Sequence, residues 1–326
     1  MVLFRIRLTF QEHPFFRKNK NSIDEFNMKL APIALFTYNR PQHTKETIEA
    51  LCLNELANES DLIIFSDAAK NDIVAKGVNE TRQYLKTVTG FKSIQIIERE
   101  SNYGLGNSII DGVSKIVSEY GRVIVLEDDL LTSPYFLRFM NESLNKYENT
   151  DDVISVHGYV YPIKEELPEN FFLIHTDSLG WGTWKRAWKF FNPNGQEILD
   201  QIEQKKISKE FNFNSSYDFI KMLKKQIKKE NNSWAIRWYG SAFLANKLSL
   251  FPQKSLVFHN GGDNTGTNCV YDSWLDVDLS EKEIPVLENL PLEENKKVRY
   301  LYESFFKTVK IPLTIKIKNK IIKLCR

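Results

Sequence analysis

Four short apolar runs, separated by stretches with helical periodicity, recur through the first 130 residues of this chain. They are rich in β-branched residues and lie at residues 33–37, 62–65, 93–97 and 123–126. Alternation of this kind predicts right-handed βαβ crossovers and a mostly parallel sheet flanked by helices. Ligands of such sheets bind beyond the carboxyl ends of the strands. The polar residues that follow each run are therefore the first candidates for a functional site.

The composition fits a globular protein built on such a sheet. Of 326 residues, 42% are hydrophobic and 26% are charged, which leaves ample chain for a core. Lys and Arg number 44 against 42 Asp and Glu, so no overall field draws the chain to nucleic acid. The three cysteines, Cys52, Cys269 and Cys325, lie far apart and indicate a reducing compartment rather than a disulfide scaffold. No run approaches 18 apolar residues, so we expect a cytoplasmic protein without a transmembrane helix or signal peptide.

The pattern divides the chain into four parts. Residues 1–27 lack a clear period and are expected to form an N-terminal extension, while residues 28–150 hold the α/β pattern. Residues 151–300 form a mixed region with short strand candidates, tryptophans and lysine-rich helices. Residues 301–326 form a basic amphipathic tail, for which we expect peripheral attachment to an anionic membrane surface or, alternatively, packing on the body.

Three tryptophans of the mixed region, Trp181, Trp184 and Trp188, recur at i, i+3 and i+7. This spacing predicts one face of a helix. A buried core face is the favoured interpretation, and an aromatic wall against a sugar ring is the alternative.

Three acids, Glu127, Asp128 and Asp129, directly follow the fourth apolar run. Like charges crowded at the edge of a core raise one another's pKa unless a cation neutralises them. Mg²⁺ and Mn²⁺ commonly bind one or two carboxylates and complete their coordination with water and phosphate. The triplet therefore predicts a divalent metal site, with solvated loop acids as the alternative. Just beyond it, Ser133 and Pro134 predict the cap and first turn of a helix.

An ordered set of motifs over residues 30–270 resembles the GT-A nucleotide-sugar glycosyltransferases. Within that group the chain is most similar to bacterial sugar transferases related to the N-acetylglucosaminyltransferase that starts complex N-glycans. The resemblance implies a GT-A, Rossmann-like sheet that binds the nucleotide sugar in residues 28–150, and an acceptor-side and catalytic region in residues 151–300. The matching stretches are Phe36–Pro41, Phe65–Asp67, Asn102–Gly106, Val125–Leu130, Ser133–Phe136 and Leu179–Trp181.

The resemblance also implies roles for individual residues. Asp129 is the direct ligand of Mn²⁺ or Mg²⁺, while Glu127 and Asp128 hold the ribose or metal-bound waters. Asp67 contacts the uracil, and Arg40 faces the base or the diphosphate. Elementary chemistry agrees, because arginine pairs bidentately with phosphate and a carboxylate accepts hydrogen bonds from a ribose or an N–H group. Asn102 belongs to the same donor-binding set.

Inverting sugar transfer needs a carboxylate that deprotonates the acceptor hydroxyl. The resemblance places this base between two tryptophans, but the matching segment, residues 234–238, contains Arg237 and no acid. By elimination we expect Asp263, in a glycine-rich loop, to be the base, with Asp177 as the second candidate. Arg237 is then expected to orient the diphosphate or an acidic partner. The departure leaves inversion or retention open.

The leading hypothesis is a metal-dependent hexosyl- or N-acetylhexosaminyltransferase. It would transfer a sugar from a UDP-linked donor to a hydroxyl of a glycan or lipid-linked acceptor in bacterial surface polysaccharide synthesis. Two alternatives stay open at this point. One is a sugar-1-phosphate nucleotidyltransferase, and the other is a glycan-binding protein without catalytic activity.

Overall fold

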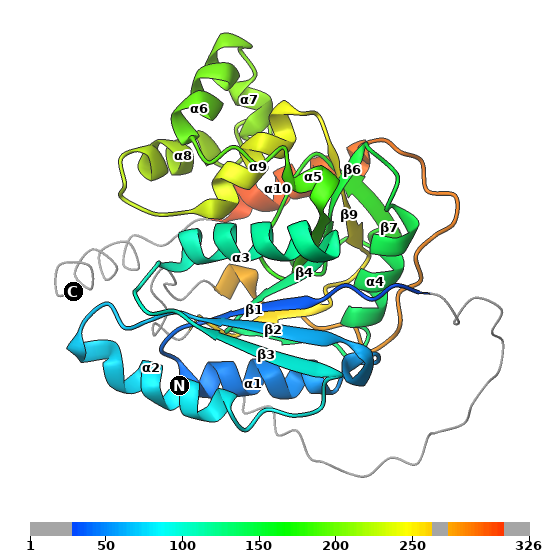
Figure 1. Ribbon diagram of the computed structural model, residues 1–326. Coiled ribbons are helices and arrows are strands. Elements are labelled where there is room, and N and C mark those ends of the chain that lie inside the picture. Colours follow the sequence, from blue (N-terminus) through cyan, green and yellow to red (C-terminus); the bar gives the residue numbers. More distant parts are fainter. Residues whose placement is uncertain (1–27, 263–272, 310–326) are drawn as a thin grey trace, which may run out of the picture.

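The computed structural model describes residues 28–262 and 273–309, and it is built around one eight-stranded sheet (Figure 1). The strand order is β3-β2-β1-β4-β8-β6-β9-β7, and the first four strands run parallel. Helices cover both faces, so the predicted α/β class is confirmed. The four parallel strands are β1 (Ile33–Thr37), β2 (Asp61–Ser66), β3 (Ser93–Glu98) and β4 (Arg122–Glu127).

Three helices connect these strands, and each begins or ends on a local signal. Helix α1 (Pro41–Cys52) starts with proline, and α2 (Asp72–Leu85) is capped by Asn71, whose side chain accepts a hydrogen bond from the Val74 N–H group. Helix α3 (Leu105–Tyr120) ends at Gly121, where a φ of 84° favours glycine. In Figure 1, α1 and α2 lie on one side of the sheet and α3 lies on the other. A short 3-10 turn, η1 (Ala57–Glu59), precedes β2.

The second half of the chain extends the same sheet. Strand β8 pairs antiparallel with β4, and β6 pairs antiparallel with β8. Strand β6 pairs parallel with β9, and β9 pairs antiparallel with β7. Two short strands, β5 and β10, form a separate antiparallel pair. The bounds are β5 (Leu130–Thr132), β6 (Val153–His157), β7 (Asn170–Leu173), β8 (Trp181–Trp184), β9 (Leu248–Pro252) and β10 (Val257–His259).

The remaining helices pack around this extension. Helix α4 begins at Phe136, two residues later than Ser133–Pro134 predicts; the Ser133 hydroxyl donates to the carbonyl of Ser280 and accepts from the Tyr135 N–H group. The bounds are α4 (Phe136–Lys146), α5 (Lys185–Trp188), α6 (Gly195–Gln204), α7 (Ser208–Phe211), α8 (Phe219–Ile227), α9 (Trp234–Leu244), η2 (Ser273–Leu275) and α10 (Lys296–Thr308).

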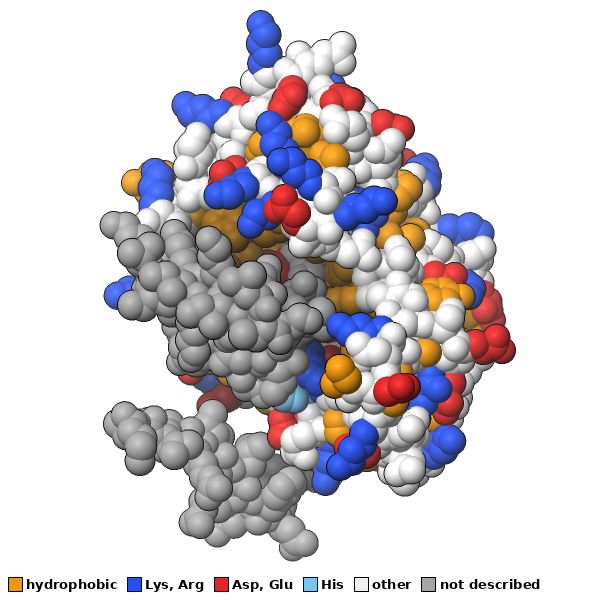
Figure 2. Space-filling model, turned by 90° about the vertical axis from the view of Figure 1, so that its left-hand side faces the viewer, with side chains coloured by type: hydrophobic (Ala, Val, Ile, Leu, Met, Phe, Trp, Pro, Cys, Tyr) orange, Lys and Arg blue, Asp and Glu red, His pale blue; other side chains and the backbone are white. Residues whose placement is uncertain are grey.

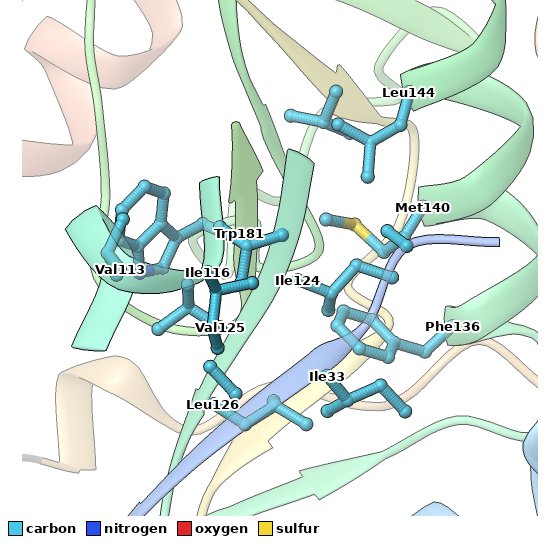
Figure 3. Packing of buried hydrophobic residues seen from close by; sticks show 14 of the residues in the cluster. Ile33, Val113, Ile116, Ile124, Val125, Leu126, Phe136, Met140, Leu144 and Trp181 are labelled. Atoms are coloured by element: carbon cyan, nitrogen blue, oxygen red, sulfur yellow. The ribbon is translucent and has the colours of Figure 1, made fainter. Parts of the chain in front are cut away.

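The tryptophans belong to the core. The prediction of one helical face is wrong, because pairing with β4 and β6 extends the stretch that holds Trp181 and Trp184 into strand β8. The ring of Trp181 is fully buried, with its centroid 5.1 Å from that of Trp234 and 6.2 Å from that of Trp238. Figure 3 shows Trp181 beside residues of α3 and β4. The core interpretation is confirmed, and these rings present no wall to a sugar.

Helix α10 belongs to the folded body. Its residues Tyr302 and Phe306 are buried in an apolar cluster formed by the second half of the chain. The boundary predicted at residue 301 therefore falls inside a helix, since α10 starts at Lys296. The predicted extension at 1–27 and the tail residues 310–326 lie outside the described residues. Among the helices of the described ranges, none is long and apolar enough to cross a membrane.

Candidate active site

The acidic triplet lies where strand β4 ends. Because β1 and β4 are parallel, with Phe36 opposite Glu127, the loop after β1 lies beside the triplet. The Tyr38 backbone N–H group donates to the Asp128 carboxylate at 3.2 Å. The side chains of Asp128 and Asp129 are only 9% and 8% exposed. Figure 2 shows the side of the molecule where these strands end.

Arg40 bridges two of the three acids. Its Nη2 atom lies 2.6 Å from Asp128 Oδ1 and 2.7 Å from Asp129 Oδ2. Burial lowers the pKa of the guanidinium, but the two carboxylates outweigh this effect and raise the pKa above its usual value. Arg40 is therefore a permanent cation inside the cluster.

His259 is a second neighbour of Asp129, besides Arg40. Strand β10 pairs with β5 so that His259 faces Leu130, which brings its Nε2 atom to 3.3 Å from Asp129 Oδ2. Burial raises the pKa of Asp129, but His259 and Arg40 reverse this and lower the pKa below its usual value. Burial, together with the two neighbouring aspartates, raises the pKa of Glu127 to about 8.

Gly261 lies directly against Asp129 and His259. A Cβ atom at Gly261 would lie 2.3 Å from Asp129 Oδ2 and 2.8 Å from His259 Nε2. Carboxylate oxygens with an imidazole nitrogen form a donor set that suits Mn²⁺. As the structure stands, Arg40 lies between the aspartates, and within residues 28–262 and 273–309 no group of three or more His, Cys, Asp or Glu side chains could hold a metal ion. Asp129 Oδ2 and His259 Nε2 are donors of the kind that such an ion binds, and in this structure Arg40 holds that oxygen.

Asp67 and Asn102 meet at the ends of β2 and β3. The Asp67 carboxylate accepts hydrogen bonds from the backbone N–H groups of Ala68, Tyr103 and Gly104, and from the side-chain amide of Asn102. These four bonds fill the acceptor positions of a carboxylate. In this structure Asp67 therefore holds the loop at residues 102–104, and it offers no open acceptor to a base. Its predicted contact with uracil stays a prediction.

Arg99 packs beside the loop at residues 102–104. Its guanidinium lies 4.3 Å from the ring centroid of Tyr103 and 5.2 Å from that of Phe65. One of its nitrogens also lies 2.5 Å from an Asp111 oxygen. Tyr103 keeps 41% of its surface exposed. The stacked arginine therefore fixes the tyrosine ring at the opening beyond β2 and β3.

Asp177 lies in the connection between β7 and β8. Its Oδ2 atom accepts a hydrogen bond from the Tyr161 hydroxyl at 2.8 Å, and its Oδ1 atom accepts from the backbone N–H groups of Ser178 and Leu179. Burial raises the pKa of Asp177, while these hydrogen bonds and the nearby charge of His259 lower it, with a net rise. Asp177 thus lies within electrostatic range of the histidine that contacts Asp129.

Asp276 is a second acid near His259, and sequence reasoning missed it. It is exposed, and partial burial raises its pKa while His259 lowers it. Asp263, the first candidate for the base, lies outside the described residues.

Arg237 does not join the triplet. It is 6% exposed within α9, and it donates to the carbonyl groups of Ser233 and Pro193. Burial lowers its pKa. Its hydrogen bonds in the described ranges are local, so its predicted role toward the diphosphate stays a prediction.

His259 is the main member of the cluster that the sequence did not single out. It lies 130 residues beyond Asp129, and only the β5–β10 pairing brings the two together. The available signal was its position as the last residue of a short apolar strand, the position that Glu127 holds in β4.

A sheet of this order, with a buried acidic cluster at the carboxyl end of its fourth strand, is the arrangement of a GT-A nucleotide-sugar glycosyltransferase. The model of glycosyl transferase family 2 matches residues 33–208, more than half of the chain, and the chain belongs to this family.

Three solved structures are similar over parts of the chain. The mannosyltransferase PcManGT from Pyrobaculum calidifontis, in complex with GDP-Man and Mn²⁺, is 9% identical with a TM-score of 0.33, covering 55% of this chain and 50% of its own. TarS from S. aureus is 12% identical with a TM-score of 0.28, covering 42% and 23%. A UDP-glucose pyrophosphorylase complexed with UDP-glucose is 10% identical with a TM-score of 0.35, covering 69% and 91%.

The chain spans half the length of the mannosyltransferase and about a quarter of TarS. The search of curated proteins finds no match to this sequence. The family assignment rests on the family 2 match, and the more specific similarity to the N-acetylglucosaminyltransferase stays a prediction.

Proposed function

We propose that this family 2 glycosyltransferase transfers a sugar from a UDP-linked donor to a hydroxyl group of its acceptor, with inversion and with a divalent cation. The observation that carries the proposal is the buried cluster of Arg40, Asp128, Asp129 and His259 at the end of β4. Acids, a guanidinium and an imidazole together match the needs of a metal-bound diphosphate.

The donor side follows from these groups. Asp129 and His259 would hold Mn²⁺ or Mg²⁺, with Asp128 and Glu127 beside them. A cation there stabilises the negative charge that develops on the departing diphosphate. Arg40 contributes a second positive charge next to the same phosphates. The loop at residues 102–104, held by Asp67, forms the wall on the nucleoside side.

For the acceptor side we propose Asp177 as the general base. Three hydrogen bonds fix its carboxylate, and they leave one acceptor position on Oδ2 for an acceptor hydroxyl. A carboxyl group whose pKa is raised by burial is a stronger base than a solvated one. Asp263 remains the alternative that the sequence predicts.

Product analysis tests the function directly. The full chain is incubated with UDP-sugars, with and without Mn²⁺, and the released products are identified. Metal-dependent release of UDP supports sugar transfer. Release of pyrophosphate from UTP and a sugar 1-phosphate would replace the proposal with a nucleotidyltransferase. Glycan binding without turnover of any donor would replace it with a binding protein.

We further propose that the acceptor is a glycan or lipid-linked glycan of the bacterial surface, and that the basic residues 310–326 bring the enzyme to the membrane. These residues lie outside the described ranges, so the sequence alone supports this step: six lysines and arginines with no acid alternate with apolar residues. Co-sedimentation with anionic liposomes should fall when residues 310–326 are deleted. Unchanged binding would contradict this attachment.

A further inference from the structure

A single guanidinium nitrogen occupies the position between two carboxylates of the triplet. Arg40 Nη2 contacts both Asp128 Oδ1 and Asp129 Oδ2. The same Asp129 oxygen lies 3.3 Å from His259 Nε2, and it packs directly against Gly261, where an added Cβ would lie 2.3 Å from it. The carboxylate oxygen best placed for a metal ion is thus already paired with an arginine.

The cluster needs this cation. Three neighbouring carboxyl groups lie at the end of a buried strand, and each raises the cost of ionising the others. Removing one partner of a buried ion pair leaves an uncompensated charge, which is strongly destabilising. Since arginine does not lose its proton in proteins, Arg40 can act as the counterion at every working pH.

Arg40 can move without rearranging the sheet. It lies at the N-cap position of α1, directly before Pro41, and its side chain is 13% exposed. Its side-chain hydrogen bonds within the described ranges run to the two aspartates alone, and its buried Nη1 atom has no partner there. Leaving the aspartates would strand the charge unless another anion receives it. A diphosphate suits this role because its oxygens accept the two parallel N–H groups of a guanidinium.

We propose that Arg40 is an exchangeable internal counterion, which neutralises Asp128 and Asp129 in the free enzyme and transfers to the diphosphate when a divalent cation enters. The inference rests on the proposed function, since it assumes a metal and a nucleoside diphosphate at this site. Its consequence is positive coupling: each ligand removes an obstacle to the other, so the two bind far better together than separately.

The test compares Mn²⁺ binding by wild type and Arg40→Gln, measured as free Mn²⁺ by electron paramagnetic resonance, with and without UDP or GDP. Wild type should bind Mn²⁺ alone weakly and at least about fivefold more tightly with the nucleotide, the lower end of ordinary coupling. Arg40→Gln removes the competing cation, so it should bind Mn²⁺ alone at least about fivefold more tightly than wild type. Its nucleotide affinity should fall, because the diphosphate loses the guanidinium.

Lys45→Gln is the matched control. It removes one positive charge from α1, the helix that begins directly after Arg40. Lys45 is half-exposed and forms an ion pair with Glu49. This variant should behave like wild type. Arg40→Lys keeps the charge with a shorter reach and should give an intermediate gain, and it carries the test if the glutamine variant does not fold.

The outcomes separate the inference from the proposed function. If wild type binds Mn²⁺ and nucleotide but folded Arg40→Gln and Arg40→Lys bind Mn²⁺ alone no more tightly, the counterion exchange is wrong. An equal gain in Lys45→Gln would also overturn it, because the effect would then be one of net charge. If neither wild type nor any variant binds Mn²⁺ or nucleotide, the proposed function itself fails, and the inference fails with it.

Discussion

Replacing Gly261 with alanine should disturb the site through a single methyl group. The added Cβ would lie 2.3 Å from Asp129 Oδ2 and 2.8 Å from His259 Nε2, so something must shift. The loop is held in place, because the Asn260 N–H group donates to the Asp129 carbonyl at 2.8 Å and the Asn260 amide donates to Glu46 at 2.6 Å. The Asp129 side chain is held as well, by Arg40.

The matched control is a substitution at the neighbouring residue, Gly262. A Cβ atom there meets nothing within 4 Å, so Gly262→Ala adds the same methyl group in open space. Either substitution removes freedom from the unfolded chain and gains about 0.4–1 kcal/mol. This gain cancels in the comparison. The difference in unfolding free energy between the two variants is then the cost of overpacking at residue 261, about 1–3 kcal/mol.

Urea denaturation measures this difference, and calorimetric titration with Mn²⁺ and UDP measures the effect on the site. Displaced neighbours of metal ligands typically cost about 10- to 100-fold in metal affinity. We expect a loss of that size for Gly261→Ala, and none for Gly262→Ala. Equal stability and equal Mn²⁺ affinity in the two variants would refute the close approach of residue 261 to Asp129.

Three further predictions address the metal ligand, the base and the buried histidines. Asp129→Ala should abolish metal-dependent UDP binding while the protein stays folded, and binding that still depends on Mn²⁺ would contradict the assignment. Asp177→Asn should leave donor binding intact but lower transfer by about 10²–10⁴-fold, whereas exposed Asp276→Asn should stay near wild type; the reverse result would exchange their roles. Burial lowers the pKa of His157 well below its usual value and that of His175 to about 3. Below pH 6.5 the unfolded chain therefore binds more protons than the folded protein, and the free energy of unfolding decreases as the pH is lowered. His157→Phe, stacking on Phe251 like the native ring, should make this acid limb shallower by about 1.4 kcal/mol per pH unit in a pH series of urea titrations, and an unchanged slope would show that His157 does not titrate on unfolding.

The sequence could predict the first half of the fold because its signals are local. The apolar runs of β1, β2 and β3 are each followed by a helix, of which α1 begins at a proline and α2 at the capping residue Asn71, and parallel pairing follows from the crossovers. The same reasoning predicts that Glu127, Asp128 and Asp129 end a buried strand, because charged residues that directly follow an apolar run mark the point where the strand leaves the core.

Local signals failed where pairing decides the conformation. The stretch with Trp181 and Trp184 carries a helical spacing, but its neighbours β4 and β6 offer hydrogen bonds that only an extended chain can use. The spacing of large apolar residues records burial, and burial is the same on a core helix and on a strand buried on both faces.

The sequence by itself therefore determined that this protein has a parallel α/β half with an acidic cluster at its carboxyl edge. The tertiary structure alone decided which groups face that cluster. Arg40 comes from the loop after β1, and His259 comes from a strand 130 residues beyond Asp129 that pairs with β5. The physical reason is that the charge state of a buried acid depends on partners within a few ångströms, and long-range strand pairing, which no local pattern records, places those partners.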